Sequence, residues 1–237
     1  MTAAWAVYRK ELRVYFVSPL AYMFLAVFLF LAGLFFYLGV SMTGEASMRM
    51  MLANLSVSLL FLLPMLTMRH FADERRNGTL ELMMTAPVPL WALLLGKWAA
   101  SLSLCLLMLV GTLLFPAILA YYGEPDWGVV ATSYLGLSLC CAAFVSAGLF
   151  ASSLTDEPVA AGLAGVVILL PFWLAGAVSK MVDGEWTKPV LEAVAFQTHI
   201  EPFSRGIIDS ADCSWFVLFS FAFLFATWRS IESRRWR

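Results

Sequence analysis

Apolar residues gather into long runs along this chain, and shorter polar segments separate the runs. A helix that crosses a bilayer needs about 20 mostly apolar residues. Six runs reach that length, so we predict an all-α integral membrane protein with six transmembrane helices in one domain, residues 1–237. The predicted spans lie near residues 19–40, 51–68, 90–121, 128–153, 158–179 and 214–230.

The N-terminal segment, residues 1–17, is amphipathic at helical spacing. Its large apolar side chains recur every three or four residues, at Trp5, Tyr8, Leu12 and Tyr15. Its basic side chains fall elsewhere on the helical wheel, at Arg9, Lys10 and Arg13. This pattern favours a short helix that lies in the membrane interface over a frayed, charged leader.

The longest polar segment, residues 180–213, precedes the last span and carries a net negative charge. Half of its stretch LEAVAFQTHIEPFSRGII is apolar. Because backbone at membrane depth must be helical or buried against protein, we expect two short external helices here that dip toward the membrane.

The composition agrees with a membrane protein. Hydrophobic residues make up 62% of the chain and charged residues 13%, whereas soluble domains carry about 25% charged residues. The net charge of −1 leaves no electrostatic footprint for nucleic acid. The four cysteines show no metal-ligand or disulfide spacing, so we expect no metal site and no cofactor bound by this chain.

The basic residues are divided unequally between the two sides of the predicted membrane. Six spans place both termini on one side, and eleven of the fifteen Lys and Arg residues fall on that side. Cytoplasmic segments carry such an excess. We therefore expect both termini in the cytoplasm.

The charged octet ERRNGTLE, residues 74–81, interrupts the apolar pattern between the second and third spans. Asn77 and Gly78 tolerate positive φ and indicate a turn. Thr79 can cap the helix that follows, and Glu81 lies in its first turn, where the helix dipole favours a carboxylate. We predict a cytoplasmic helix–turn–helix knob that docks on a soluble partner; the alternative is an ordinary solvated loop.

Candidate catalytic or ion-binding chemistry is sparse. Lys97 follows a glycine but lacks the glycine-rich loop of a nucleotide site, so we interpret it as snorkelling from the third span to the headgroups. Both histidines, His70 and His199, fall in predicted loops, which leaves no base for a serine nucleophile inside the spans. No Asp, Glu or His lies near the centre of a span, which disfavours an ion-coupled carrier.

Residues 71–100, FADERRNGTLELMMTAPVPLWALLLGKWAA, resemble the signature between the second and third spans of ABC-2 type transporter permeases. The matching positions are Glu74, Gly78, Thr79, Leu80, Glu81, Leu82, Pro87, Leu95, Gly96 and Lys97. The permeases of gliding-motility and copper-site-maturation ABC systems are the subgroup it resembles most. That subgroup is matched before the last span at His199, Phe203, Arg205, Gly206 and Asp209. Residues 151–162 resemble its turn between spans four and five, which more often carries Asn-Gln where this chain has Asp156 and Glu157.

The resemblance implies a non-catalytic subunit of the bacterial cytoplasmic (inner) membrane that pairs with a second permease copy or a paralogue. It implies that a coupling element, residues 69–89, inserts into a separate ABC ATPase subunit that binds ATP and Mg, with a second contact at residues 154–158. The implied ATPase-coupling residues are Glu74, Arg75, Gly78, Thr79, Glu81, Asp156 and Glu157. The external loop, with His199, Phe203, Arg205 and Gly206, would gate an exit or meet a membrane-anchored accessory protein with an extracytoplasmic domain.

We therefore predict the permease subunit of an ATP-binding cassette transporter, with export as the favoured direction. Two alternatives stay open. One is an ATP-driven mechanical or signalling complex that acts on an extracytoplasmic partner without solute flux. The other is an ion-coupled secondary carrier, which transport without ATP would establish.

Overall fold

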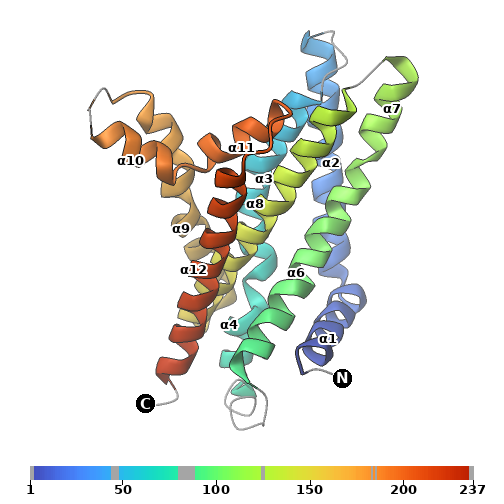
Figure 1. Cartoon of the computed structure of the whole chain (residues 1–237). Helices are drawn as coiled ribbons and strands as arrows, with labels where there is room; N and C mark the ends of the chain where they lie inside the picture. The colour runs from blue at the N-terminus through green and yellow to red at the C-terminus, as the bar shows by residue number, and fades with distance from the viewer. Residues whose placement is uncertain are drawn as a thin grey trace.

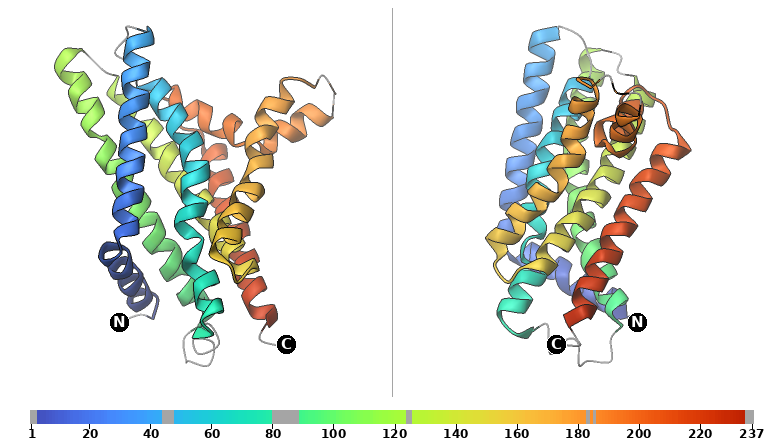
Figure 2. Two further views of the ribbon diagram at one scale, coloured as in Figure 1. Left: turned by 180° about the vertical axis from the view of Figure 1, so that it is seen from behind. Right: turned by 90° about the vertical axis from the view of Figure 1, so that its left-hand side faces the viewer.

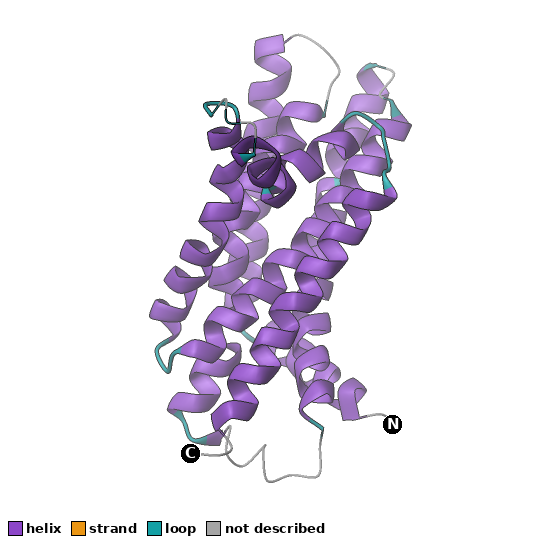
Figure 3. Cartoon of the chain, turned by 60° about the vertical axis from the view of Figure 1, so that its left-hand side comes forward, coloured by secondary structure: helices purple, strands orange, loops and turns teal. Residues whose placement is uncertain are grey.

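The computed structural model describes residues 3–43, 48–79, 89–123, 126–182, 184 and 186–234. Over these residues the chain is helical and contains no strand (Figure 3). The helices are α1 (Ala3–Val17), α2 (Pro19–Thr43), α3 (Arg49–Thr67), α4 (Arg69–Arg76), α6 (Leu90–Thr112), α7 (Leu114–Tyr122), α8 (Trp127–Leu154), α9 (Pro158–Ser179), α10 (Thr187–Val194), α11 (Phe196–Ser204) and α12 (Ser210–Arg234).

In the part of the chain that the structure describes, six helices are long and apolar enough to cross a membrane, which confirms the predicted six-span architecture. They cover Pro19–Ser41, Met50–Arg76, Leu90–Tyr121, Trp127–Leu154, Pro158–Ser179 and Ser210–Ser233. The second of them extends well past its predicted end at residue 68, because Met68 keeps helical φ and ψ of −55° and −30° and α3 runs on into α4. Residues 69–76, the first part of the expected coupling element 69–89, therefore form the end of a long helix.

The two ends of the bundle carry different short helices. Helices α1 and α4 lie at the same end as both chain termini, whereas α10 and α11 lie at the opposite end (Figure 1). We call these the terminal end and the α10–α11 end. Figure 2 shows α9 leaning outward toward the α10–α11 end, so that α10 lies to one side of the bundle.

Helix α8 forms the centre of the bundle and packs against α3, α6, α9, α11 and α12. Its small residues Ala143, Ala147 and Ala151 are fully buried. On α9, a Cβ added at Gly165 would lie 2.7 Å from Cβ of Pro64 on α3. Small side chains thus let α3, α8 and α9 approach closely, as is common where helices pack in a bilayer.

Candidate functional site

Helix α1 packs along α6 at the terminal end. A Cβ added at Gly96 would lie 2.9 Å from the carbonyl oxygen of Ala4, so the absence of a side chain there permits the contact. The Tyr8 hydroxyl points toward α6, 3.1 Å from Oγ of Ser103, while Trp5 is half exposed and stacks on the Tyr8 ring. The amphipathic helix expected at the N-terminus is present, and its inner face contacts protein.

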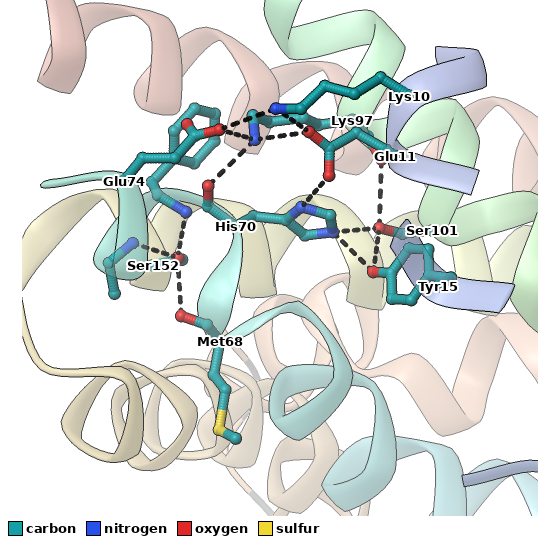
Figure 4. Close-up of polar contacts among 11 residues, drawn as sticks. Lys10, Glu11, Tyr15, Met68, His70, Glu74, Lys97, Ser101 and Ser152 are labelled. Atoms are coloured by element: carbon teal, nitrogen blue, oxygen red, sulfur yellow. Dashed lines mark hydrogen bonds and ion pairs between the residues drawn. The ribbon is translucent and has the colours of Figure 1, made fainter. Parts of the chain in front are cut away.

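A buried lysine connects three helices beside this contact. Lys97 on α6 is only 1% exposed, and its ammonium donates to Oε1 of Glu74 on α4 at 2.6 Å and to Oε1 of Glu11 on α1 at 3.2 Å (Figure 4). It also donates to the His70 carbonyl at 3.1 Å and lies 5.3 Å from the centre of the Phe71 ring. These partners compensate for the loss of water around the charge. The snorkelling interpretation of Lys97 is wrong, because the ammonium points into the bundle.

Lys97, Glu11 and Glu74 form a buried cluster of charges. His70 extends this cluster to the hydroxyl groups of Tyr15 and Ser101. Its Nε2 lies 2.7 Å from the Tyr15 hydroxyl and 2.6 Å from Oγ of Ser101, and its Nδ1 lies 3.8 Å from Oε2 of Glu11 (Figure 4). The prediction that His70 falls in a loop is wrong, because the residue is buried in α4. Burial raises the pKa of the Tyr15 phenol above its ordinary value. The phenol therefore stays protonated and can serve as donor and acceptor in the cluster.

The two carboxylates of the cluster differ in how well they are satisfied. Burial raises the pKa of Glu11, but its cationic neighbours, Lys97 above all, outweigh that effect and hold the pKa below its ordinary value. Lys10 adds a weaker contact to each carboxylate, at 3.3 Å to Glu11 and 3.8 Å to Glu74. The second oxygen of Glu74, Oε2, is buried without a hydrogen-bond partner among the described residues. Because an unpaired buried acceptor costs free energy, Glu74 is the least satisfied member of the cluster.

The end of α4 carries the turn predicted from the octet. The Asn77 amide donates to the Asp73 carbonyl, and Gly78 has a φ of +68°, a conformation that favours glycine. The Thr79 hydroxyl donates to the Glu74 carbonyl at 3.1 Å and so satisfies the last turn of α4. Glu81 and the helix expected after it fall in residues 80–88, outside the described part of the chain.

The turn between α8 and α9 lies against this end of α4. Arg75 forms an ion pair with Asp156 through its Nε, and it also donates to the Leu154 carbonyl at 3.2 Å. Glu157, next to this pair, is exposed. The structure therefore brings together the two segments expected to form the cytoplasmic contact surface.

A serine of α8 fixes the junction between α3 and α4. Ser152 accepts from the backbone amides of Phe71 and Ala72 at 2.9 and 3.2 Å, and its hydroxyl donates to the Met68 carbonyl at 2.9 Å (Figure 4). It thereby satisfies backbone groups at the point where α3 passes into α4.

At the α10–α11 end, His199 connects three segments. Its Nδ1 lies 2.6 Å from the Asp212 carboxylate on α12, and its Nε2 lies 3.1 Å from the Ala193 carbonyl on α10. Its ring stacks on Trp215, whose indole N–H donates to the same Ala193 carbonyl at 2.9 Å. Helices α10 and α11 are the two short helices expected before the last span, and His199 lies in α11, where it fastens α10 to α12.

The other residues expected in the external loop have structural contacts. Phe203 is fully buried, and its carbonyl accepts from the hydroxyls of Thr132 and Ser133 on α8 at 2.8 and 3.2 Å. Gly206 follows α11 with a φ of +85°, which lets the chain turn toward α12. Arg205 is exposed and pairs with Glu201 one turn before it.

A family model described as ABC-2 family transporter protein matches residues 43–204, more than half of the chain. The chain belongs to the ABC-2 transporter family. No curated protein matches it. Family membership makes the chain a multi-pass membrane subunit of an ABC transporter, of a kind that is typically non-catalytic and works with a separate ABC ATPase. Over the described residues, this permease has no cluster of three or more His, Cys, Asp or Glu side chains that could hold a metal.

Sequence reasoning missed most of the buried cluster of this permease. Glu11 was not singled out, although it lies three residues after Tyr8 and four before Tyr15, on the face that packs inward. A carboxylate on such a face requires a buried cation as partner. The spacing of Glu11 from Tyr8 and Tyr15 could therefore have predicted a buried cation, which the structure identifies as Lys97.

Proposed function

We propose that this permease couples ATP hydrolysis in a separate ABC ATPase subunit, which binds ATP and Mg, to export of a substrate. The terminal end faces the cytoplasm in this proposal, in keeping with the excess of Lys and Arg there. The docking surface consists of residues 74–79 at the end of α4, the segment up to residue 89, and the α8–α9 turn at residues 154–158. The observation that carries the proposal is the contact of Arg75 with Asp156 and Leu154, which joins the end of α4 and the α8–α9 turn into one surface.

The buried cluster offers a route by which a force on this surface reaches the rest of the bundle. Glu74 precedes the docking turn by one helical turn, and its carboxylate contacts Lys97 on α6 at 2.6 Å. The same ammonium contacts Glu11 on α1. A displacement of the end of α4 therefore changes the environment of a buried charge shared with α1 and α6, which is energetically costly unless those helices follow.

The remaining partners follow from the exposed apolar surfaces. In this proposal α2 faces lipid or a second permease copy along its exposed side chains, among them Tyr22, Phe30 and Tyr37. Helix α10 has no buried residue and exposes Val190. It would meet an accessory protein outside the membrane.

Purification of the tagged permease from its native membrane in mild detergent tests this function. We expect an ABC ATPase to co-purify and to support ATP-dependent substrate export in reconstituted vesicles. Arg75→Asp and Asp156→Arg should each lower ATP-driven export, and the double exchange should restore part of it because the ion pair is re-formed. Arg229→Gln, which changes an exposed arginine on α12 outside the docking surface, is the matched control.

Three results would contradict the proposal in different ways. Absence of any co-purifying ATPase removes the coupling role of the terminal end. ATPase activity that responds to an extracytoplasmic partner without flux favours a mechanical or signalling complex. Transport driven by an ion gradient without ATP identifies a secondary carrier.

A further inference from the structure

A cavity of about 270 Å³ lies at the terminal end, between α1, the start of α2 and the junction of α3 with α4. Its inner wall is the charged cluster, and its outer part reaches the surface, where Val14 and Met65 are 54% and 47% exposed. A space of this size admits several water molecules or a small polar group.

The cavity wall carries equal numbers of positive and negative side chains, and two of these side chains form no ion pair. Cations and anions are equal in number, namely Lys10, Arg69 and Lys97 against Glu11, Asp73 and Glu74. Lys10 and Lys97 already contact Glu11 and Glu74. Arg69 and Asp73 form no ion pair with any described residue, although they lie one turn apart on α4. One positive and one negative group thus line the cavity within about 6 Å along the helix.

The opposite part of the wall is apolar. It is formed by Val14 of α1, Leu20 and Phe24 of α2, and Met65 and Leu66 of α3. Leu20 and Phe24 belong to the first turns of a membrane-crossing helix, and Met65 lies near the end of α3. The cavity therefore changes from charged to apolar along the direction in which a lipid changes from headgroup to acyl chain.

We propose that this cavity binds the headgroup of a phospholipid that carries both a phosphate and a primary ammonium, of the phosphatidylethanolamine type. Arg69 and Lys10 donate to the phosphate, since guanidinium and ammonium groups bind phosphate oxygens well. Asp73 accepts from the ammonium. The first acyl carbons lie on Phe24 and Met65, and the chains continue outside the cavity along α2 and α3.

The balance of charge decides between classes of lipid. A headgroup with a net negative charge would leave Asp73 without a cation and place it near a second anion, which is unfavourable in a partly buried site. A quaternary ammonium would satisfy the charge of Asp73 but cannot donate a hydrogen bond to it. A primary ammonium does both, and so fits better than the other two.

Native mass spectrometry of the purified permease, with lipids added one at a time in detergent, tests the site. We expect phosphatidylethanolamine to be retained about tenfold better than phosphatidylcholine or phosphatidylglycerol, in line with the loss of one charge-assisted hydrogen bond. Stepwise N-methylation of the headgroup should lower retention at each step. Asp73→Asn should remove the preference for ethanolamine while phosphatidylglycerol is retained at least as well as before.

Variants of the cation separate the lipid site from general loss of structure. Arg69→Gln should weaken retention of all three phospholipids, and Arg69→Lys should restore part of it. Arg13→Gln, an exposed position on α1 outside the cavity, is the control and should bind as the unaltered chain does. Equal retention of the three lipids, or equal retention in Asp73→Asn and the unaltered chain, would overturn the proposal.

Soluble compounds distinguish a lipid from a free phosphate compound. Phosphoethanolamine or inorganic phosphate at millimolar concentration should leave the bound lipid in place, because neither has acyl chains to contact Phe24 and Met65. Displacement by either compound would show that the cavity takes a soluble phosphate, and the lipid proposal would be wrong.

Discussion

The two ends of the bundle are held together by different kinds of polar contact. At the terminal end, the ammonium of Lys97 joins Glu11 and Glu74, which lie 86 and 23 positions away along the chain. At the α10–α11 end, His199 and Asp212 are 13 positions apart, and the other contacts are mainly hydroxyl and indole groups that donate to backbone carbonyls. One end is a set of charges shielded from water and shared by three helices, whereas the other is a series of separate, mostly neutral contacts.

This difference determines how each end responds to a change. Removing one member of a buried charge pair leaves its partner uncompensated, so the cost exceeds the value of the contact itself. A neutral hydrogen bond to a carbonyl that keeps a second donor costs only about 1 kcal/mol when it is lost. The terminal end is thus the end where a local displacement affects several helices at once.

The largest expected loss of stability comes from Lys97→Met. The substitution keeps a long unbranched side chain and removes the buried charge, which leaves Glu11 and Glu74 with only the weaker contacts of the exposed Lys10. We expect a loss of about 3–5 kcal/mol in the free energy of unfolding, seen as a lower apparent Tm in detergent. Lys188→Met, the same change at an exposed position on α10, is the control and should have little effect.

A triple variant sharpens this result. Glu11→Gln and Glu74→Gln added to Lys97→Met remove all three charges, so a large part of the lost stability should return. If Lys97→Met is as stable as the unaltered chain, the terminal end is not held by charge, and its contrast with the other end disappears.

Gly96→Ala should also destabilise the terminal end. The new Cβ would lie 2.8 Å from Cβ of Val7, so α1 must move away from α6. We expect a net loss of about 1–2 kcal/mol after the gain in helix propensity is included, together with faster tryptic cleavage in α1 at Arg9 and Arg13.

A second glycine provides the comparison. Gly39→Ala places a Cβ at 3.6 Å from Cβ of Met50, an ordinary contact, so it should be neutral or slightly stabilising. If the two alanine variants unfold at the same temperature, close packing of α1 on α6 does not support the cluster.

The α10–α11 end should respond less to a comparable change. His199→Phe keeps an aromatic ring against Trp215 and removes the hydrogen bonds to Asp212 and Ala193. The Ala193 carbonyl retains the indole N–H of Trp215, but the largely buried Asp212 carboxylate loses its partner, so we expect a loss of about 1–3 kcal/mol in the free energy of unfolding. Adding Asp212→Asn should recover part of this loss, because it removes the uncompensated charge; a drop as large as that of Lys97→Met would contradict the contrast between the two ends.

The six spans were predictable because hydropathy alone decides them. A run of apolar residues long enough to cross a bilayer has few other stable arrangements. The continuation of α3 into α4 was not predictable in this way, since Arg69 and Asp73 are as compatible with a loop as with the polar end of a helix. The continuation depends on Ser152, 80 or more positions away along the chain, which satisfies the backbone of the junction.

The burial of Lys97 shows why the site was harder to predict than the fold. A lysine near the end of a span can reach the headgroups or turn inward, and its own neighbours in sequence do not distinguish the two. The choice depends on where Glu11 lies, and so on the packing of α1 against Gly96. The turn at Asn77 and Gly78 was predictable because turn chemistry is local, whereas the cluster is made of contacts between distant segments.

The smallest expected change in stability is that of Glu11→Gln. Its dependence on pH tests whether the charge of Glu11 stabilises the terminal end. Because the folded-state pKa of Glu11 lies below its ordinary value of 4.5, its contribution to stability is present above pH 4.5 and is lost as the pH falls through the lower, folded-state pKa. Glu11→Gln should therefore lower the apparent Tm at pH 7 by about 2–4 °C, as expected for about 1 kcal/mol in a chain of this size, and the difference should shrink below pH 4.

Glu157→Gln, which removes an exposed carboxylate at the same end, should leave the Tm unchanged at both pH values. A difference between the unaltered chain and Glu11→Gln that stays constant from pH 7 to below pH 4 would mean that the packing of this side chain, rather than its charge, stabilises the contact between α1 and α6.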